Sequence, residues 1–199
     1  MMSVPKNRYV CFFSLAVIGL IVDLLTKWWA FTSLGYEYRS SETWLTPLWG
    51  ENVFVFMTSF NHGALWGLGQ GYSWLFASLS IVAVVGVIYW LFVRGAAHSW
   101  WLTISLGLIM AGALGNLYDR LGLHGLTDEN GVVQHAVRDF LYIKIINWPI
   151  FNFADMYLVT GAAMLLIQSF REEDAVACPA DQDAATTTDS PAAPLARSA

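Results

Sequence analysis

The chain has 199 residues, of which 56% are hydrophobic, 13% are charged and ten are tryptophans. This balance is far more apolar than that of a soluble domain of this size, so we expect lipid to be the main solvent. The formal charge of −5 comes largely from an acidic tail, and nothing in the composition points to nucleic acid.

The first apolar segment runs from Tyr9 to Phe31 and follows the basic residues Lys6 and Arg8. Basic residues before an apolar run are also typical of a secretory signal peptide. Here the run continues through Asp23 and Lys27 without a small-residue cleavage site, and three further apolar segments follow. We therefore interpret it as a retained first membrane span.

Three more segments, 72–93, 100–118 and 151–170, are long and apolar enough to cross a bilayer as helices. The segment 100–118 carries Gly107, Ala111 and Gly115 at intervals of four, a flattened stripe that predicts close packing against a neighbouring helix. The tail 171–199 is rich in small residues and lacks apolar periodicity. The sequence thus predicts one all-α membrane domain over residues 1–170, with spans at about 9–31, 72–93, 100–118 and 151–170, and a disordered acidic tail over 171–199.

An even number of spans places both termini on one side of the membrane and the long loops 32–71 and 121–150 on the other. Strand-like runs at 53–56, 132–137 and 141–146 predict a small β-sheet in these loops, resting on the membrane surface. Because Lys6 and Arg8 flank the first span, we expect both termini to be cytoplasmic and the sheet to be extracytoplasmic.

This topology brings polar residues from three spans to the extracytoplasmic side. Ionisable groups at membrane depth are costly, so their gathering at one edge is a functional-site hypothesis. The residues are Asp23, Lys27, Asn116, Asp119, Arg120, Asn152 and Asp155.

Each polar group also has a purely structural interpretation. Asp23 and Lys27 are four apart, a spacing that fits a structural ion pair as well as a substrate-facing role. Arg120 either complements the dipole at a helix end or offers its fork of donors to a carbonyl or headgroup phosphate. Asp155 is either a favourable charge at a helix start or, with Asp139 of the loop, half of a carboxyl pair that shares one proton.

Other chemistries have weaker support in the sequence. There is no H-E-x-x-H metal helix, the histidines lack ligand spacing, and no G-x-S-x-G elbow is present. Tyr118 and Asp119 form the Y-D pair of presenilin-type proteases, but the G-x-G-D partner motif is absent. A proton-relaying transporter would favour inverted repeats, which the spans lack. A purely structural tetraspan protein would leave the one-sided carboxyls unexplained.

Several motifs in order resemble bacterial lipoprotein signal peptidase, the type II signal peptidase, over essentially all of residues 9–170. Each is weak alone, but their order and topology together are specific. They are Asp23 with Lys27; Asn61, Gly63 and Ala64; Gly112, Ala113, Gly115, Asn116, Asp119 and Arg120; Asp139 with Phe140; and Phe151, Asn152, Ala154 and Asp155.

The resemblance implies a monomeric aspartic endopeptidase of the bacterial inner membrane that needs no cofactor. Its substrates would be diacylglyceryl-modified prolipoproteins, cleaved before the lipidated cysteine within the phospholipid membrane, and it would be sensitive to globomycin-type inhibitors. Asp139 and Asp155 would be the catalytic pair. Asn61, Gly63, Asn116, Arg120 and Asn152 would line the site and position the substrate backbone, and Asp23, Lys27 and Asp119 would support it.

The chain departs from the family pattern at three places. Leu65 and Trp66 stand where the first-loop motif usually continues with Ala and Phe, Arg138 replaces an apolar residue before the catalytic Asp, and 122–136 resembles an insertion. These departures bear on the shape of the substrate groove and on the pKa of Asp139.

Overall fold

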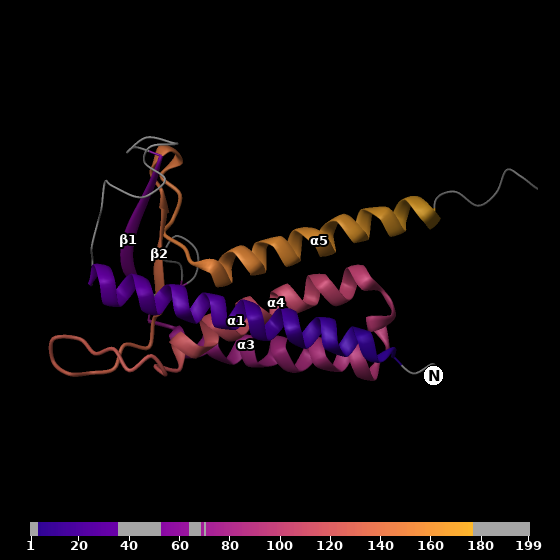
Figure 1. The fold of residues 1–199 in the computed structure, drawn as a ribbon, viewed down its shortest axis with the longest axis horizontal. Helices are drawn as coiled ribbons and strands as arrows, with labels where there is room; N and C mark the ends of the chain where they lie inside the picture. The colour runs from indigo at the N-terminus through magenta and orange to yellow at the C-terminus, as the bar shows by residue number, and fades with distance from the viewer. Residues whose placement is uncertain (1–3, 36–52, 64–68, 70, 177–199) are drawn as a thin grey trace, which may run out of the picture. The chain divides into compact units, whose positions relative to one another are not determined.

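The computed structural model describes residues 4–35, 53–63, 69 and 71–176 (Figure 1). Ala64, Leu65 and Trp66 of the first-loop motif lie outside the described residues, as does the part of the expected tail after residue 176.

Within these described residues, four helices are long and apolar enough to cross a membrane, as the sequence predicts. They are α1 (Lys6–Leu34), α3 (Ser73–Ile88) with its π-helical extension η2 (Tyr89–Val93), α4 (Trp100–Arg120) and α5 (Phe153–Val176). The short 3-10 helix η3 (Ala96–His98) joins α3 to α4. In α5 the apolar span ends at Phe170, but the helix continues to Val176, because Arg171, Glu172 and Glu173 are good helix formers.

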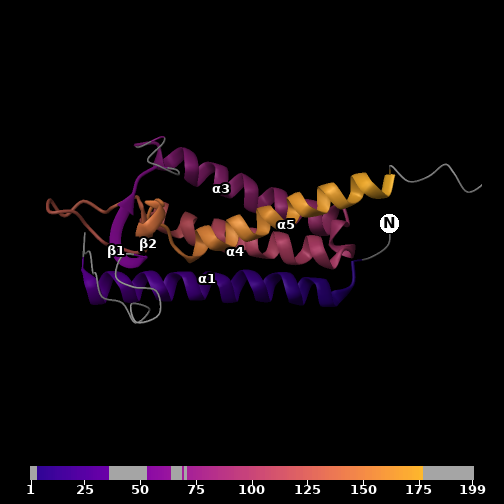
Figure 2. The same cartoon turned by 90° about the horizontal axis from the view of Figure 1, so that it is seen from above.

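Small residues let α1 approach α4, which lies between α1 and α3 (Figure 2). A Cβ at Gly19 would lie 2.7 Å from the Cβ of Ala111, and a Cβ at Gly115 would collide with the Asp23 carboxyl. The predicted stripe on α4 therefore packs against a neighbouring helix, which is α1. The first turns of α5 also lie on α4, where Gly112 faces the carbonyl of Ala154.

A two-stranded antiparallel sheet stands across the helix direction at one end of α1 (Figure 1). Its strands are β1 (Phe54–Asn61) and β2 (Val137–Ile143), paired with Ser59 opposite Asp139. The register shifts between Phe56 and Ser59, so that two residues of β1 oppose one of β2. Such a bulge bends and twists a strand, and this one lies directly beside Asp139.

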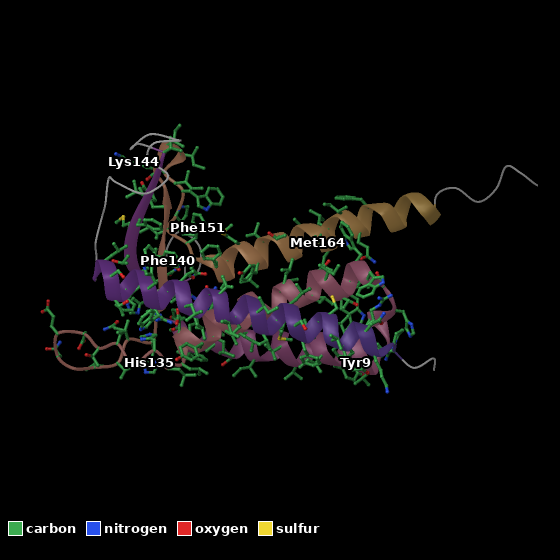
Figure 3. The ribbon with its side chains drawn as sticks, in the orientation of Figure 1. Tyr9, His135, Phe140, Lys144, Phe151 and Met164 are labelled. Carbon is green, nitrogen blue, oxygen red and sulfur yellow. The ribbon has the colours of Figure 1, made fainter. Side chains whose placement is uncertain are left out.

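Aromatic residues join the sheet to the end of α1. Ala30 and Phe31 of α1 form one buried cluster with Phe140 and Leu141 of β2. Phe140 and Phe151 lie together at the base of the sheet, and Tyr9 lies at the far end of the bundle (Figure 3). The other edge of β2 pairs with Phe151, whose N–H and carbonyl both bond to Leu141. This contact fixes the segment that leads into α5.

Two of the three strand-like runs behave differently from the prediction. The run 132–137 contributes only its last residue to β2, since residues 127–133 form a tight loop in which the Asp128 carboxyl accepts the N–H groups of Asn130 and Val132. Residues 144–146 form the 3-10 helix η4 (Lys144–Ile146) instead of a strand. The small sheet itself is confirmed, with 54–61 and 137–143 as its strands.

Candidate active site

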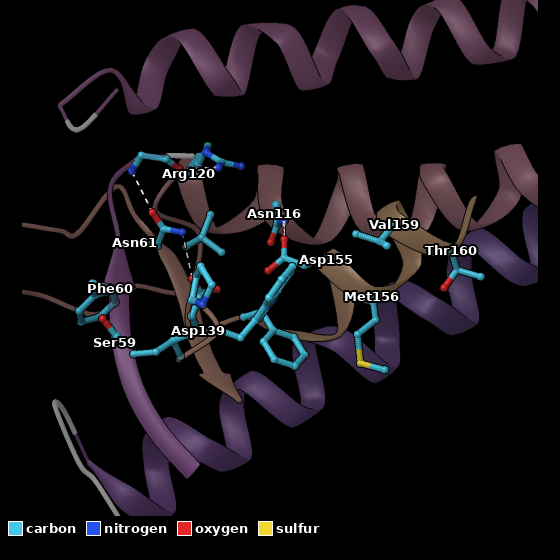
Figure 4. Close-up of a pocket in the computed structure, with 16 residues that line it drawn as sticks. Ser59, Phe60, Asn61, Asn116, Arg120, Asp139, Asp155, Met156, Val159 and Thr160 are labelled. Atoms are coloured by element: carbon cyan, nitrogen blue, oxygen red, sulfur yellow. Dashed lines mark hydrogen bonds between the residues drawn. The ribbon is translucent and has the colours of Figure 1, made fainter. Parts of the chain in front are cut away.

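A cavity of about 760 Å³ opens where the sheet, the end of α4 and the start of α5 meet (Figure 4). Six of the predicted site residues line it: Asn61, Gly63, Asn116, Arg120, Asp139 and Asp155. The other four are buried: Lys27 and Asn152 contact residues of the cavity wall, and Asp23 and Asp119 pair with Lys27 behind them. The structure therefore brings all ten predicted residues into one cluster.

Asp139 lies on β2 and is only 2% exposed. Both of its carboxyl oxygens accept an amide N–H: Oδ1 from Asn152 Nδ2 at 2.6 Å and Oδ2 from Asn61 Nδ2 at 3.0 Å. Burial raises the pKa of Asp139 well above its usual range, and the nearby charge of Asp155 raises it further. The opposing effects of Lys27 and the two amides are smaller. Asp139 is therefore a carboxyl that holds a proton at unusually high pH.

Asp155 is held at the start of α5 by a reciprocal cap. The Asn152 side-chain oxygen accepts the Asp155 N–H at 3.0 Å, and the Asp155 Oδ2 accepts the Asn152 N–H at 3.1 Å. This is the geometry of a capping box, and the helix N-terminus favours the negative charge of Asp155. The spacing of three residues noted in the sequence thus serves the helix start and the cavity together. Asn152 contacts both carboxyls and fixes them relative to each other.

Asn116 connects the carboxyl pair to the buried charges behind it. Its Nδ2 donates to Asp155 Oδ1 at 2.8 Å, and its Oδ1 accepts from Lys27 Nζ at 3.1 Å and from Asn152 Nδ2 at 3.2 Å. Because a lysine can only donate, its contact fixes which end of the Asn116 amide faces Asp155.

Lys27 joins two buried carboxylates. Its Nζ lies 2.7 Å from Asp23 and 3.1 Å from Asp119, and all three side chains are fully buried. The other oxygen of Asp23 accepts the Ala154 N–H at 2.9 Å and so anchors the first turn of α5. Of the two interpretations of Asp23 and Lys27, the structure has the ion pair, since neither residue lines the cavity.

Arg120 reaches the cavity from the end of α4. Its Nη2 donates to the carbonyl of Gly63 at 3.3 Å, and the Gly63 N–H donates to Asn61 Oδ1 at 3.0 Å. Its buried Nε has no hydrogen-bond partner among the described residues. The Arg120 Nε–H is therefore a free donor within the described part of the chain, and the Gly63 contact links Arg120 to the Asn61 amide that contacts Asp139.

Arg138 is the site residue whose role the sequence does not reveal. Although it lies in the strand next to Asp139, its side chain is only 5% exposed and pairs with Asp119 at 2.8 Å. Two signals in the sequence point to a buried partner. The apolar neighbours Val137 and Phe140 indicate a covered strand, and a buried cation needs a nearby anion.

Cation sites made of His, Cys, Asp or Glu are absent from the described part of the chain, where no three of these residues are grouped to hold a metal. The carboxyls of the cavity are instead satisfied by amides, as the paired groups in Figure 4 show. The arrangement is suited to acid–base chemistry by two carboxyls.

Comparison with known proteins shows the family of the chain. A family model described as signal peptidase (SPase) II matches residues 15–171. Proteins named lipoprotein signal peptidase are similar to the chain: that of Rhodopirellula baltica is 44% identical over 83% of this chain and 74% of its own length. That of Anoxybacillus flavithermus is 34% identical over 81% and 86%, and that of Bacillus subtilis is 30% identical over 79% and 91%.

Two solved bacterial membrane enzymes share the fold. One superposes with a TM-score of 0.67 at 24% identity and covers 81% of this chain and 88% of its own. The other has a TM-score of 0.62 at 25% identity and covers 79% and 90%. With four membrane-spanning helices, a small sheet and the matched family model, this multi-pass membrane protein belongs to the signal peptidase II family and is a peptidase.

Proposed function

We propose that the chain is an aspartic endopeptidase that removes signal peptides from diacylglyceryl-modified prolipoproteins, cleaving before the lipidated cysteine. The observation that carries the catalytic type is the pair Asp139 and Asp155, which line one cavity and are bridged by Asn152. The relatives of this chain are named lipoprotein signal peptidase, which supports prolipoproteins as the substrate class.

The two carboxyls divide the acid and base roles by their environments. Burial raises the pKa of Asp139 well above its usual range, and Asp155 lies at a helix N-terminus, which favours a negative charge, and accepts two N–H groups. Because such a pair titrates as a unit, the active form of the enzyme carries one proton on the dyad. Asp155 is then the general base and Asp139 the general acid.

Hydrolysis follows in two steps. A water between the carboxyls loses a proton to Asp155 and attacks the scissile carbonyl carbon, while Asp139 gives its proton to the carbonyl oxygen. The resulting gem-diol is neutral. It then returns a proton from one hydroxyl to Asp139, Asp155 protonates the departing nitrogen, and the C–N bond breaks. Water is consumed, and each carboxyl recovers its starting state.

The cavity offers a polar wall and an apolar wall to the substrate. Asn61, Gly63 and Arg120 present amide, backbone and guanidinium groups that can bind the backbone around the scissile bond. On the other wall, Met156 and Val159 of α5 face the same cavity (Figure 4) and can contact the apolar signal helix or the acyl chains. Globomycin-type inhibitors and membrane phospholipid would occupy the same groove.

We also propose the orientation given by Lys6 and Arg8, with both termini in the cytoplasm and the cavity near the extracytoplasmic face. A single cysteine placed at Glu129 should react with an impermeant thiol reagent added to intact spheroplasts, and one placed at Arg94 should not. Labelling of the cysteine at 94 but not of the one at 129 would show that the topology is the reverse of the one proposed.

The peptidase is proposed to act as a monomer through residues 1–170. A chain that ends at Val176 should therefore process prolipoproteins like the full chain and elute at monomer size from a detergent column. Loss of processing on removal of 177–199 would give the tail a role in catalysis.

Complementation of a bacterium depleted of its lipoprotein signal peptidase tests the proposal. Wild-type chain should restore the mature form on a gel, and Asp139→Asn and Asp155→Asn should each leave the precursor while still inserting. Asp128→Asn is the matched control, because Asp128 serves a loop outside the cavity and an amide oxygen can still accept its N–H bonds. Processing by both dyad variants would refute the aspartic mechanism.

A further inference from the structure

Arg138 makes three contacts with one carboxylate. Its Nε and Nη2 donate to Asp119 Oδ1 at 3.0 and 2.8 Å, and its backbone N–H donates to Asp119 Oδ2 at 3.0 Å. Both oxygens of Asp119, at the end of α4, are therefore bound by the residue that directly precedes Asp139. A planar guanidinium that donates through two nitrogens restricts orientation as well as distance.

The contact adds to the pairing with β1 and to the bonds from the Phe140 and Leu141 N–H groups to the Phe151 carbonyl, which also hold β2 here. Among the residues that the structure describes the sheet has two strands, and β1 is bulged opposite Phe140, immediately after Asp139. Two-stranded ribbons are marginal on their own, so the position of Asp139 depends on anchors outside the sheet. The Asp119 pair is the anchor to α4, the helix that also carries Asn116.

The Arg138–Asp119 pair is also connected to Asp155 through buried polar contacts. Asp119 Oδ2 also lies 3.1 Å from Lys27 Nζ, which contacts Asn116, and Asn116 donates to Asp155. Arg138 thus acts on Asp139 through the backbone and on Asp155 through buried polar contacts.

Arg138 also balances the charge of the site. Without it, Lys27 would be the one cation shared by Asp23 and Asp119, leaving an unpaired negative charge behind the dyad. With it, four carboxyls face three cations, so the net charge is zero when the dyad holds one proton. The groups counted are Asp23, Asp119, Asp139, Asp155, Lys27, Arg120 and Arg138.

We propose that Arg138 is a positioning residue that holds Asp139 in register with α4 and Asp155 by clamping Asp119. This inference rests on the proposed aspartic mechanism. Its removal should lower kcat more than it changes KM, because the residue touches neither the cavity nor the substrate.

The test compares the purified full-length enzyme with Arg138→Leu and Arg138→Lys in a cleavage assay on a lipidated prolipoprotein peptide, from acid to alkaline pH. We expect Arg138→Leu to lower kcat about 10- to 100-fold, as a displacement near 1 Å does, with KM changed less than threefold. Loss of the positive charge should also move the whole bell-shaped profile to higher pH, because both dyad carboxyls then face more negative charge.

Other charged groups around the dyad stay in place and set the reference profile. They are Asp23 and Lys27 from α1, Asp119 and Arg120 from α4, and the titratable His124, which lies near Asp119 and Arg138 in the loop after α4, while β1 contributes the neutral Asn61. Arg138→Lys keeps the charge but not the planar fork, so it should keep the wild-type profile with kcat reduced several-fold. Arg94→Leu, which removes an exposed arginine at the other end of the bundle, should match wild type.

The outcomes separate this inference from the proposed function. A wild-type enzyme that cleaves, with an inactive Asp139→Asn, upholds the function, and wild-type kcat with an unshifted profile in Arg138→Leu then overturns the inference alone. The same holds if Arg138→Leu yields less folded enzyme but the folded enzyme keeps the wild-type kcat and pH profile, because Arg138 would then serve folding alone. If Arg138→Leu does not fold, Arg138→Lys decides, since wild-type kcat there overturns the clamp.

Discussion

Gly115→Ala would disturb the site without touching the cavity. A Cβ at Gly115 would collide with the Asp23 carboxyl, lie 3.0 Å from its Cγ and lie 3.2 Å from the Cβ of Ala154. None of these is the free end of a long side chain, so α1 or α5 must shift. Overpacking of this kind costs about 1–3 kcal/mol. Because Asp23 binds the Ala154 N–H, the shift would also move Asp155, and we expect kcat to fall about 100-fold.

Two other glycines give matched controls for the same substitution. A Cβ at Gly86 of α3 meets nothing within 4 Å, so Gly86→Ala should stabilise the helix by about 0.5–1 kcal/mol. A Cβ at Gly107 would lie 3.3 Å from Leu15, so Gly107→Ala should fall between the two. For a chain of this size about 1 kcal/mol moves Tm by 2–4 °C, which separates Gly115→Ala from Gly86→Ala by roughly 3–16 °C.

Thermal unfolding in detergent, followed by tryptophan fluorescence, and kcat in the same detergent would measure both effects. The expected order of Tm is Gly86→Ala, then Gly107→Ala, then Gly115→Ala, with a large loss of kcat only in the last. Gly115→Ala with the Tm and kcat of Gly86→Ala would refute the tight packing of α1, α4 and α5 around Asp23.

Three further predictions follow from the buried polar groups. Since the pKa of Asp139 is raised in the folded protein, the stability of the wild type should fall as pH rises from the ordinary pKa of an aspartate through the raised one. Between pH 5 and pH 8 the Tm of Asp139→Asn should therefore fall less than the Tm of the wild type. An equal fall in both proteins would contradict the effect of burial on Asp139. Lys27→Met should destabilise the fold by about 3–5 kcal/mol, because it leaves the buried Asp23 without a cation and Asp119 with Arg138 alone. Adding Asp23→Asn should recover part of the lost Tm, and no recovery would argue against a shared lysine. Asn152→Ala should cost about 1 kcal/mol of stability through the lost cap and reduce kcat far more than KM; cleavage at the wild-type rate would show that the bridge between the carboxyls is not needed.

The membrane architecture could be predicted from the sequence because hydrocarbon thickness and the need to satisfy backbone groups leave few solutions. The four apolar segments, the close face of α4 and the small sheet all correspond to features of the structure. The strand boundaries could not be predicted. In 132–137 the side chain of Asp128 binds loop N–H groups and competes with strand pairing, and the bulge in β1 depends on tertiary contacts.

Which residues gather at the site could be predicted from topology and motif order, but the contacts among their side chains could not. Spacing alone left Asp23 and Lys27 open between an ion pair and a substrate contact, and the structure has the pair. Asn116 contacts both Lys27 and Asp155. These residues are far apart in the chain, so no local sequence pattern indicates the contacts. Arg138 appeared in the sequence only as a departure from the family pattern, because its partner Asp119 lies on another element.

The measurement that bears most directly on the paired carboxyls is single-turnover cleavage of a lipidated prolipoprotein peptide by purified wild-type enzyme, Asp139→Asn and Asp155→Asn at equal folded concentration. Asp128→Asn provides the control for loss of an aspartate outside the cavity. We expect wild-type rates in the control and a loss of at least about 10²-fold in each dyad variant, since removal of a catalytic acid or base costs about 10²–10⁴-fold. A rate within tenfold of wild type in either dyad variant would contradict the account of Asp139 and Asp155 as the catalytic pair.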